Sequence, residues 1–165
     1  MRRLFALVVL TCGAVTACGH HRAVDHAALA SRYAAAVKPF LLDGSRLVAV
    51  DVRPGVGDLE FHEVTPEDYR SRAASWKQQL ERIRRQVAGV RPPSFLRDAA
   101  AQYDASLRQY QAAIDAFVVA SYAPSDGLAA AITRAAPVAQ QADATYDRAE
   151  AMVQAVIDGA KGAGS

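Results

Sequence analysis

The chain has 165 residues, 52% of them hydrophobic and 22% charged, which is the composition of one globular domain rather than of a disordered chain. The net charge of +2 comes from Arg2 and Arg3, because 17 basic and 17 acidic side chains remain from Cys18 onward. This balance leaves no electrostatic footprint for nucleic acid or for long-range attraction to an anionic membrane. We therefore expect no nucleic-acid partner.

The first 17 residues have the order of parts of a secretory signal. Arg2 and Arg3 form a positive start, and an uncharged stretch of 14 residues runs from Leu4 to Ala17. A transmembrane helix needs about 20 apolar residues, so this stretch is too short for a permanent span. We predict a cleavable signal peptide over residues 1–17.

The residues Val15, Thr16, Ala17 and Cys18 resemble the lipobox of bacterial lipoproteins. In that family the chain is cut before the cysteine, which becomes the acylated N-terminal residue. The resemblance implies that Cys18 carries the lipid, such as palmitate, and that the membrane is a partner through this lipid. It also implies a location on the extracytoplasmic face of the cell membrane. The rest of the chain is similar only in general to small Ala-rich lipoproteins of actinobacterial type.

After the cysteine we expect a polar tether over residues 18–24 and a helical bundle over residues 25–160. Apolar residues on the first helix recur in steps of three and four, which puts them on one face. Pro39 near its end should kink or stop this helix. The stripe consists of His26, Ala30, Tyr33, Val37 and Phe40.

The second and third helices begin at capping signals. Thr65 and Pro66 suit an N-cap and a first helical position, Pro92 and Pro93 end that helix, and Ser94 is expected to cap the next. Each helix has one apolar stripe in steps of three and four. The stripes are Tyr69, Ala73, Trp76, Leu80, Ile83, Val87 and Val90, and then Leu96, Ala100, Tyr103, Leu107, Tyr110, Ile114, Phe117 and Ser121.

The fourth helix follows a break at Pro124 and is expected to close at Gly159, leaving a flexible tail over residues 161–165. Pro137 should kink it or divide it into two helices in line. Short connections make neighbouring helices antiparallel, so we predict an all-α, four-helix up-and-down bundle. The fourth stripe is Leu128, Ile132, Ala135, Ala139, Ala142, Tyr146, Ala149, Val153 and Val156.

Residues 44–64, between the first two helices, follow a different pattern. Val48, Val50 and Val52 alternate with polar or small residues, and residues 54–57 are turn-like. The pattern fits either a small hairpin or an irregular crossover. In both interpretations the segment lies outside the regular helices.

The sequence contains no recognisable catalytic or metal-binding motif. A cluster of possible zinc or copper ligands follows the cysteine and consists of His20, His21, Asp25 and His26. A flexible tether provides no fixed geometry for such a site, so we expect no metal. We find no glutamate and histidine pair typical of di-iron bundles and no nucleophile elbow. We therefore expect neither a cofactor nor an enzyme.

Two groups of side chains are candidate binding residues. Trp76, Tyr103 and Tyr110 lie on inward stripes and either line a ligand cavity or fill the core opposite alanines. Residues 70–91 carry a charge of +6 and the fourth helix carries −3. Either these helices neutralise each other, or a basic strip binds lipid headgroups or an acidic partner. The candidate partner-binding residues are Arg82, Arg84 and Arg85.

These observations favour a lipid-anchored interaction protein of the cell envelope that binds an unknown envelope protein and has no catalytic activity. The alternative is a carrier or sensor of a small apolar ligand held in the core of the bundle. An enclosed cavity between the helices would favour the alternative.

Overall fold

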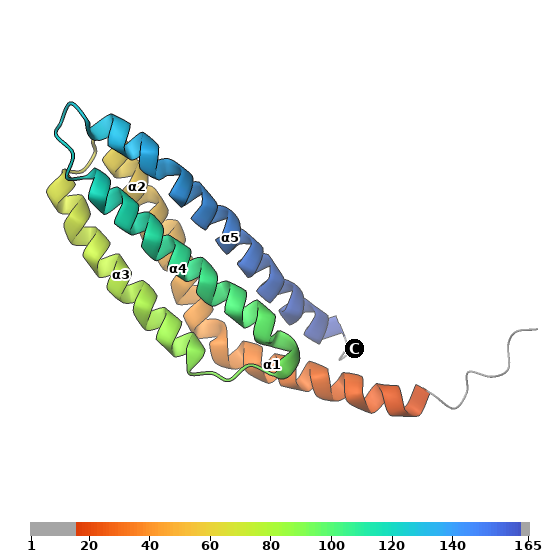
Figure 1. The fold of residues 1–165 in the computed structure, drawn as a ribbon. Helices are drawn as coiled ribbons and strands as arrows, with labels where there is room; N and C mark the ends of the chain where they lie inside the picture. The colour runs from red at the N-terminus through yellow and green to blue at the C-terminus, as the bar shows by residue number, and fades with distance from the viewer. Residues whose placement is uncertain (1–15, 163–165) are drawn as a thin grey trace, which may run out of the picture.

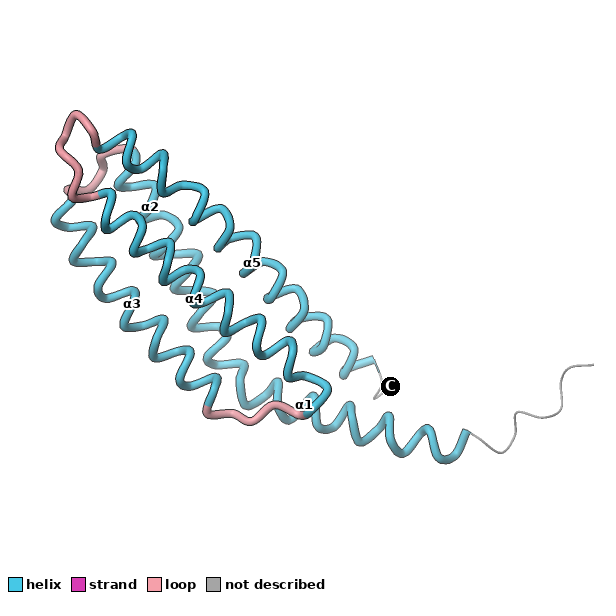
Figure 2. Tube along the Cα trace, in the orientation of Figure 1, coloured by secondary structure: helices cyan, strands magenta, loops and turns pink. Residues whose placement is uncertain are grey.

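The computed structural model describes residues 16–162, which form a bundle of long helices without a strand among them (Figures 1 and 2). The first two α-helices and the π-helical segment between them follow one another as one continuous rod. The elements are α1 (Thr16–Arg46), the π-helix (Leu47–Val52), α2 (Arg53–Glu60), α3 (Pro66–Ala88), a 3-10 turn (Ser94–Leu96), α4 (Arg97–Ala120) and α5 (Leu128–Gly162).

The rods run up, down, up and down, so chain neighbours are antiparallel (Figure 1). Helix α3 packs between α1 and α4, and α5 packs between α4 and α1. This arrangement is a closed ring of four rods around one core. The predicted all-α bundle is confirmed.

The predicted stripes of α3, α4 and α5 form most of the core, whereas the first rod contributes Leu47, Val48, Val52 and Leu59, which lie outside its predicted stripe. Six of the seven stripe residues on α3 are buried, and the exception, Val90, lies partly exposed after the helix ends. On α4 the stripe is buried apart from the half-buried Ala100. The stripe of α5 is buried from Leu128 to Ala149 except for the half-buried Ala139.

Residues 44–64 correct the prediction of a hairpin or irregular crossover, because the chain stays helical to Glu60. Val48 and Val52 are buried, whereas Val50 between them is 61% exposed. Residues four apart share a helix face and the residue midway lies opposite, so a short helix can give the same alternation as a strand. The alternation of three valines therefore fits a strand and a helix equally well.

The π-helix has a local cause in Pro54. Proline cannot donate a backbone hydrogen bond, and its ring clashes with the carbonyl four residues earlier in an α-helix. Here the helix widens over Leu47–Val52 just before the proline, and the N–H of Arg53 donates to the carbonyl of Val48. A π-turn of this kind lets the rod continue past the proline.

Helix α2 ends in a turn in which His62 takes the position that a glycine usually occupies. His62 has φ 59°, the left-handed conformation that usually selects glycine. The N–H of Glu63 donates to the carbonyl of Asp58 at 2.8 Å, which closes the last turn. The chain then extends to Thr65, whose hydroxyl accepts from the N–H of Asp68 as the predicted N-cap.

Several predicted boundaries differ in the structure. Helix α1 continues through Pro39 and already begins at Thr16, so the backbone of residues 18–24 is helical where we expected a tether. Helix α5 continues as one helix through Pro137, which rules out the alternative of two separate helices, and it runs to Gly162, past the expected end at Gly159. Ser94 lies inside the 3-10 turn before α4 and does not cap that helix.

Residues 1–15 lie outside the described residues, as does the side chain of Cys18, so the predictions of a signal peptide and a lipidated cysteine stay predictions. Among the helices that the structure describes, none is long and apolar enough to cross a membrane.

Candidate interaction surfaces

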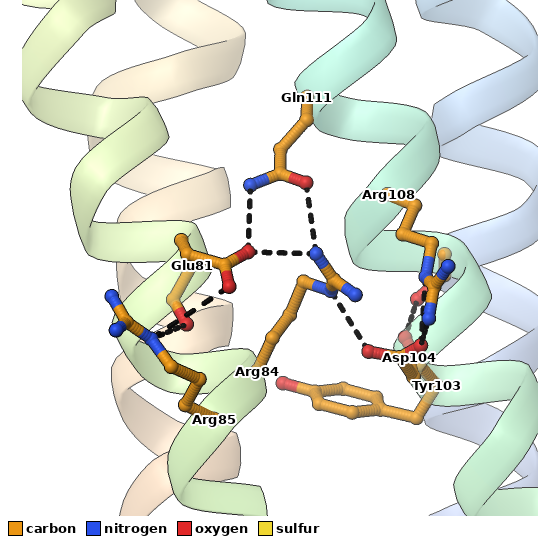
Figure 3. Close-up of polar contacts among 8 residues, drawn as sticks. Glu81, Arg84, Arg85, Tyr103, Asp104, Arg108 and Gln111 are labelled. Carbon is orange, nitrogen blue, oxygen red and sulfur yellow. Dashed lines mark hydrogen bonds and ion pairs between the residues drawn. The ribbon is translucent and has the colours of Figure 1, made fainter. Parts of the chain in front are cut away.

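The three arginines predicted to bind a partner lie in different surroundings, and Figure 3 shows two of them, Arg84 and Arg85. The side chain of Arg84 is only 17% exposed and points toward α4, where its Nε donates to Asp104 at 2.8 Å. Its Nη1 donates to Glu81 at 2.7 Å and to Gln111 at 3.2 Å. The side chain of Arg85 is 74% exposed and lies 3.7 Å from Glu81.

Arg84 is therefore a link between α3 and α4, which corrects its assignment as a surface contact. Burial opposes the charge of Asp104, but hydrogen bonds from Arg84 and Arg108 outweigh it and lower the pKa of this carboxyl group. Arg82, by contrast, is exposed and forms no ion pair with a described residue. Only Arg82 and Arg85 of the trio face solvent.

Two other basic residues of α3 form ion pairs with neighbouring helices, and Arg70 pairs with Glu67 of α3 itself. Lys77 forms an ion pair with Asp115 of α4, and Arg72 lies 3.3 Å from Asp58 of α2. In these two contacts, acidic residues of α4 and of the α1–α2 rod neutralise basic residues of α3. The expectation that the basic second helix pairs with the acidic fourth helix is therefore wrong in its choice of partner.

Two acidic residues of α5, Asp143 and Asp147, pair instead with Arg53, which was not identified from the sequence. Its Nε donates to Asp143 at 2.8 Å and its Nη2 donates to Asp147 at 2.7 Å. The hydroxyl of Tyr110 donates to Asp143 and accepts from Arg53. Burial opposes the charge of Arg53, but the bonds to Asp147 and Asp143 raise its pKa. This cluster joins α2, α4 and α5.

A second polar contact joins α1 to α5 two turns away. Ser45 donates to Glu150 at 2.7 Å and lies 3.0 Å from the hydroxyl of Tyr146. A serine hydroxyl has one proton, so Tyr146 must donate to Ser45. The hydroxyls of Tyr110 and Tyr146 thus reach polar partners at the edge of the bundle, whereas the buried hydroxyl of Tyr69 has none among the described residues.

Trp76, Tyr103 and Tyr110 do not surround one cavity. Trp76 lies against Gly55, where a Cβ would come 2.1 Å from its ring, and the Tyr103 hydroxyl lies against Gly44 in the same way, at 2.4 Å. Burial raises the pKa of Tyr103. Each large ring occupies the space that a missing Cβ leaves on the first rod.

Tyr110 lines a small, partly open cavity of about 70 Å³ beside the π-helix. Ligand sites for small molecules usually have about 300–1,000 Å³, and a water takes up about 30 Å³ in the liquid. The cavity has room for about two waters. It is lined by Val52, Arg53, Val56, Tyr110, Ala113, Ile114, Ala139 and Asp143.

A larger, open groove of about 670 Å³ runs between α4 and α5 near the turn that joins them. Val119 and Tyr122 on its rim are 72% and 70% exposed, and the guanidinium of Arg70 lies 4.4 Å from the centre of the Tyr122 ring. One acid and one base, Asp115 and Arg134, are the charged residues of its lining. The small lining residues are Ala112, Ala116, Ala120, Ala123, Ala131 and Ala135.

The comparisons with known proteins give no match. No family model, no curated protein and no solved structure is similar to this chain at a significant level. The described side chains also contain no group of three or more histidine, cysteine or acidic residues that could hold a metal.

Two residues that were not identified from the sequence, Gly44 and Gly55, could have been found from their positions. Gly44 and Gly55 each fall on the buried face of a helical rod, which is a position where a glycine marks close approach by a large side chain. No sequence pattern indicated the groove, because the alanines of an Ala-rich chain occur both in the core and on the surface.

Proposed function

We propose that this chain is a lipid-anchored binding protein of the cell envelope, held on the extracytoplasmic face of the membrane through Cys18. The lipobox residues and the signal-like sequence before them support the anchor. Multiple acyl chains, at about 0.8 kcal/mol per buried methylene, would hold the protein firmly on a membrane.

The anchor is tested by replacing Cys18 with serine and following the protein in membrane and soluble fractions. The wild-type chain should fractionate with membranes and carry a mass increase on Cys18, and C18S should lose the acyl mass and leave the membrane. An unchanged fractionation of C18S, or an unmodified wild-type cysteine, would contradict the anchor.

The binding surface that we propose is the groove between α4 and α5, and its partner is a helical segment of an envelope protein. The carrying observation is the exposure of Val119 and Tyr122 beside a row of alanines. Exposed apolar surface with a polar rim is typical of protein interaction sites, and small residues let a helix approach closely. The 70 Å³ cavity is too small to favour the alternative of a ligand carrier.

Crosslinking in whole cells followed by pull-down tests this surface with a matched pair of variants. Val119→Asp places a charge in the groove, whereas Val50→Asp makes the same change at a comparably exposed position on the first rod. We expect V119D to lose a specific crosslinked protein that V50D retains. The same partners for both variants, or none for the wild type, would contradict the proposal.

A further inference from the structure

The charged residues of the bundle are sorted along its long axis. The contacts of Gly44 with Tyr103 and of Gly55 with Trp76 show which levels of the rods coincide. The half nearer the start of α1 comprises residues 28–46, 78–108 and 145–152, and contains ten basic and six acidic residues, a charge of +4. The other half, residues 47–77 and 109–144, contains five basic and nine acidic residues, a charge of −4.

The excess of positive charge in the basic half lies on the surface. Arg82, Arg91 and Arg97 are exposed at the end of α3, in the turn and at the first residue of α4. None of them forms an ion pair with a described residue, and the same is true of the exposed Lys38 and Arg46 on α1. Paired arginines such as Arg84 are already neutralised, and these five bases outnumber the exposed acids of the same half that have no ion pair with a described residue, which are Asp43, Asp98 and Glu150.

The basic half also exposes apolar side chains on the same rod. Leu42, 60% exposed, lies between Lys38 and Arg46, each one helical turn away. A helix face that alternates basic and apolar residues suits the boundary between headgroups and acyl chains of an anionic membrane. The acidic half would be repelled by the same surface.

The basic half is the half from which α1 leads to Cys18. In Figure 1 the N-terminal part of α1 extends beyond the bundle, past the turn between α3 and α4. We propose that the bundle docks on anionic phospholipid headgroups through its basic half, and that its acidic half points away from the membrane. This inference rests on the proposed lipid anchor.

Docking requires a particular position of α1. Ala30, the first residue described as buried, follows Cys18 by twelve residues, which span about 18 Å of helix. The Debye length at physiological salt is about 8 Å, so a helix standing upright would hold the basic half out of electrostatic range. The N-terminal part of α1 must therefore lie along the membrane surface.

Fluorescence quenching on vesicles measures this orientation. The full chain is purified from host membranes, its intact mass is recorded, and a fluorophore is attached at Ser94→Cys in the basic half or at Ser125→Cys in the opposite turn. The vesicles contain phosphatidylcholine with a spin-labelled headgroup, either alone or with phosphatidylglycerol. In vesicles that contain phosphatidylglycerol we expect strong quenching at position 94 and weak quenching at position 125. Without phosphatidylglycerol, or in high salt, the two positions should not differ.

A matched pair of charge reversals isolates the basic half. Arg91→Glu and Arg134→Glu make the same change at exposed residues that have no ion pair among the described side chains, one in each half. Each unit of charge near an anionic surface changes the ratio of docked to undocked protein about fivefold, so R91E, a change of two charges, should lower this ratio about 25-fold. R134E should not lower it.

Three results would overturn the docking proposal. These are equal quenching at positions 94 and 125, quenching that phosphatidylglycerol does not change, and equal effects of R91E and R134E. If R91E instead abolishes binding to soluble polyglutamate without changing quenching, the basic half binds an anionic polymer and the lipid proposal is wrong.

The intact mass separates this proposal from the anchor. An unacylated Cys18 would refute the anchor, and the same preparation would then be sedimented with the two kinds of vesicle. Sedimentation that needs phosphatidylglycerol and is lost in R91E would still support docking, and sedimentation independent of both would refute it.

Discussion

A matched pair of glycine substitutions in α2 tests the packing of the first rod against α3. Gly55 and Gly57 lie two residues apart in the same helix, but a Cβ at Gly55 would come 2.1 Å from the ring of Trp76, whereas a Cβ at Gly57 would meet nothing within 4 Å. Replacing either glycine with alanine favours the helix by about 0.8–1.0 kcal/mol. The two variants therefore differ only in the contact with Trp76.

The magnitudes follow from this difference. Gly57→Ala should raise the free energy of unfolding by up to about 1 kcal/mol. Gly55→Ala gains the same helix preference but forces Trp76 aside, and overpacking of a core costs about 1–3 kcal/mol. We expect Gly55→Ala to be about 1–3 kcal/mol less stable than Gly57→Ala, because the helix preference cancels between them.

Urea denaturation followed by far-UV circular dichroism measures both free energies, and the fluorescence of Trp76 reports whether its surroundings change. The emission should shift in Gly55→Ala and stay constant in Gly57→Ala. Equal stabilisation of the two variants would mean that Trp76 does not lie against Gly55, and the register between α2 and α3 would be wrong.

The remaining predictions concern the polar contacts. Arg84→Gln should lower the free energy of unfolding by about 1–3 kcal/mol, and Arg85→Gln by less than about 0.5 kcal/mol, because only Arg84 is held between α3 and α4; equal losses in urea denaturation would contradict this. Tyr110→Phe should cost about 1 kcal/mol by the same assay. Tyr69→Phe should cost nothing or stabilise, since the buried Tyr69 hydroxyl has no partner among the described residues. The pKa of Asp104 is lowered in the folded state, so the charged Asp104 stabilises the fold fully above about pH 4, the pKa of the unfolded chain. This contribution is lost as the pH falls through the lower pKa of the folded state. The free energies of unfolding of wild type and Asp104→Asn should therefore converge at low pH.

The core could be predicted from sequence because helices of four turns or more repeat their pattern often enough to exclude other structures. The stripe from Tyr69 to Val87 contains six residues in regular steps, and all six are buried. The segment around Val50 is shorter, and its alternation fits a strand or a helix equally well. The widening before Pro54 has its local cause in that proline, but a proline can end, kink or widen a helix, so its presence alone did not specify a π-helix.

The polar contacts could be predicted less well, because a charge pair depends on which helices are neighbours. The net charges of α3 and α5 suggested that these two helices pair, but in the ring each lies between α4 and the first rod. Arg53 belonged to a segment expected outside the helices, so its role beside Asp143 and Asp147 was not visible. Adjacent residues such as Arg84 and Arg85 differ only in the direction that the helix gives them.

A neutral chain can still have a directional electrostatic field. The sequence as a whole suggested no attraction to an anionic membrane, because basic and acidic residues balance from Cys18 onward. Folding changes this conclusion, since antiparallel helices bring residues 28–46 and 78–108 to one end and remove paired charges such as Arg84 and Asp104 from the surface balance. An anionic surface acts only within about 8 Å at physiological salt, so it responds to the near half of the molecule and not to the sum. The charge that decides docking is therefore set by topology, and a total over the sequence does not report it.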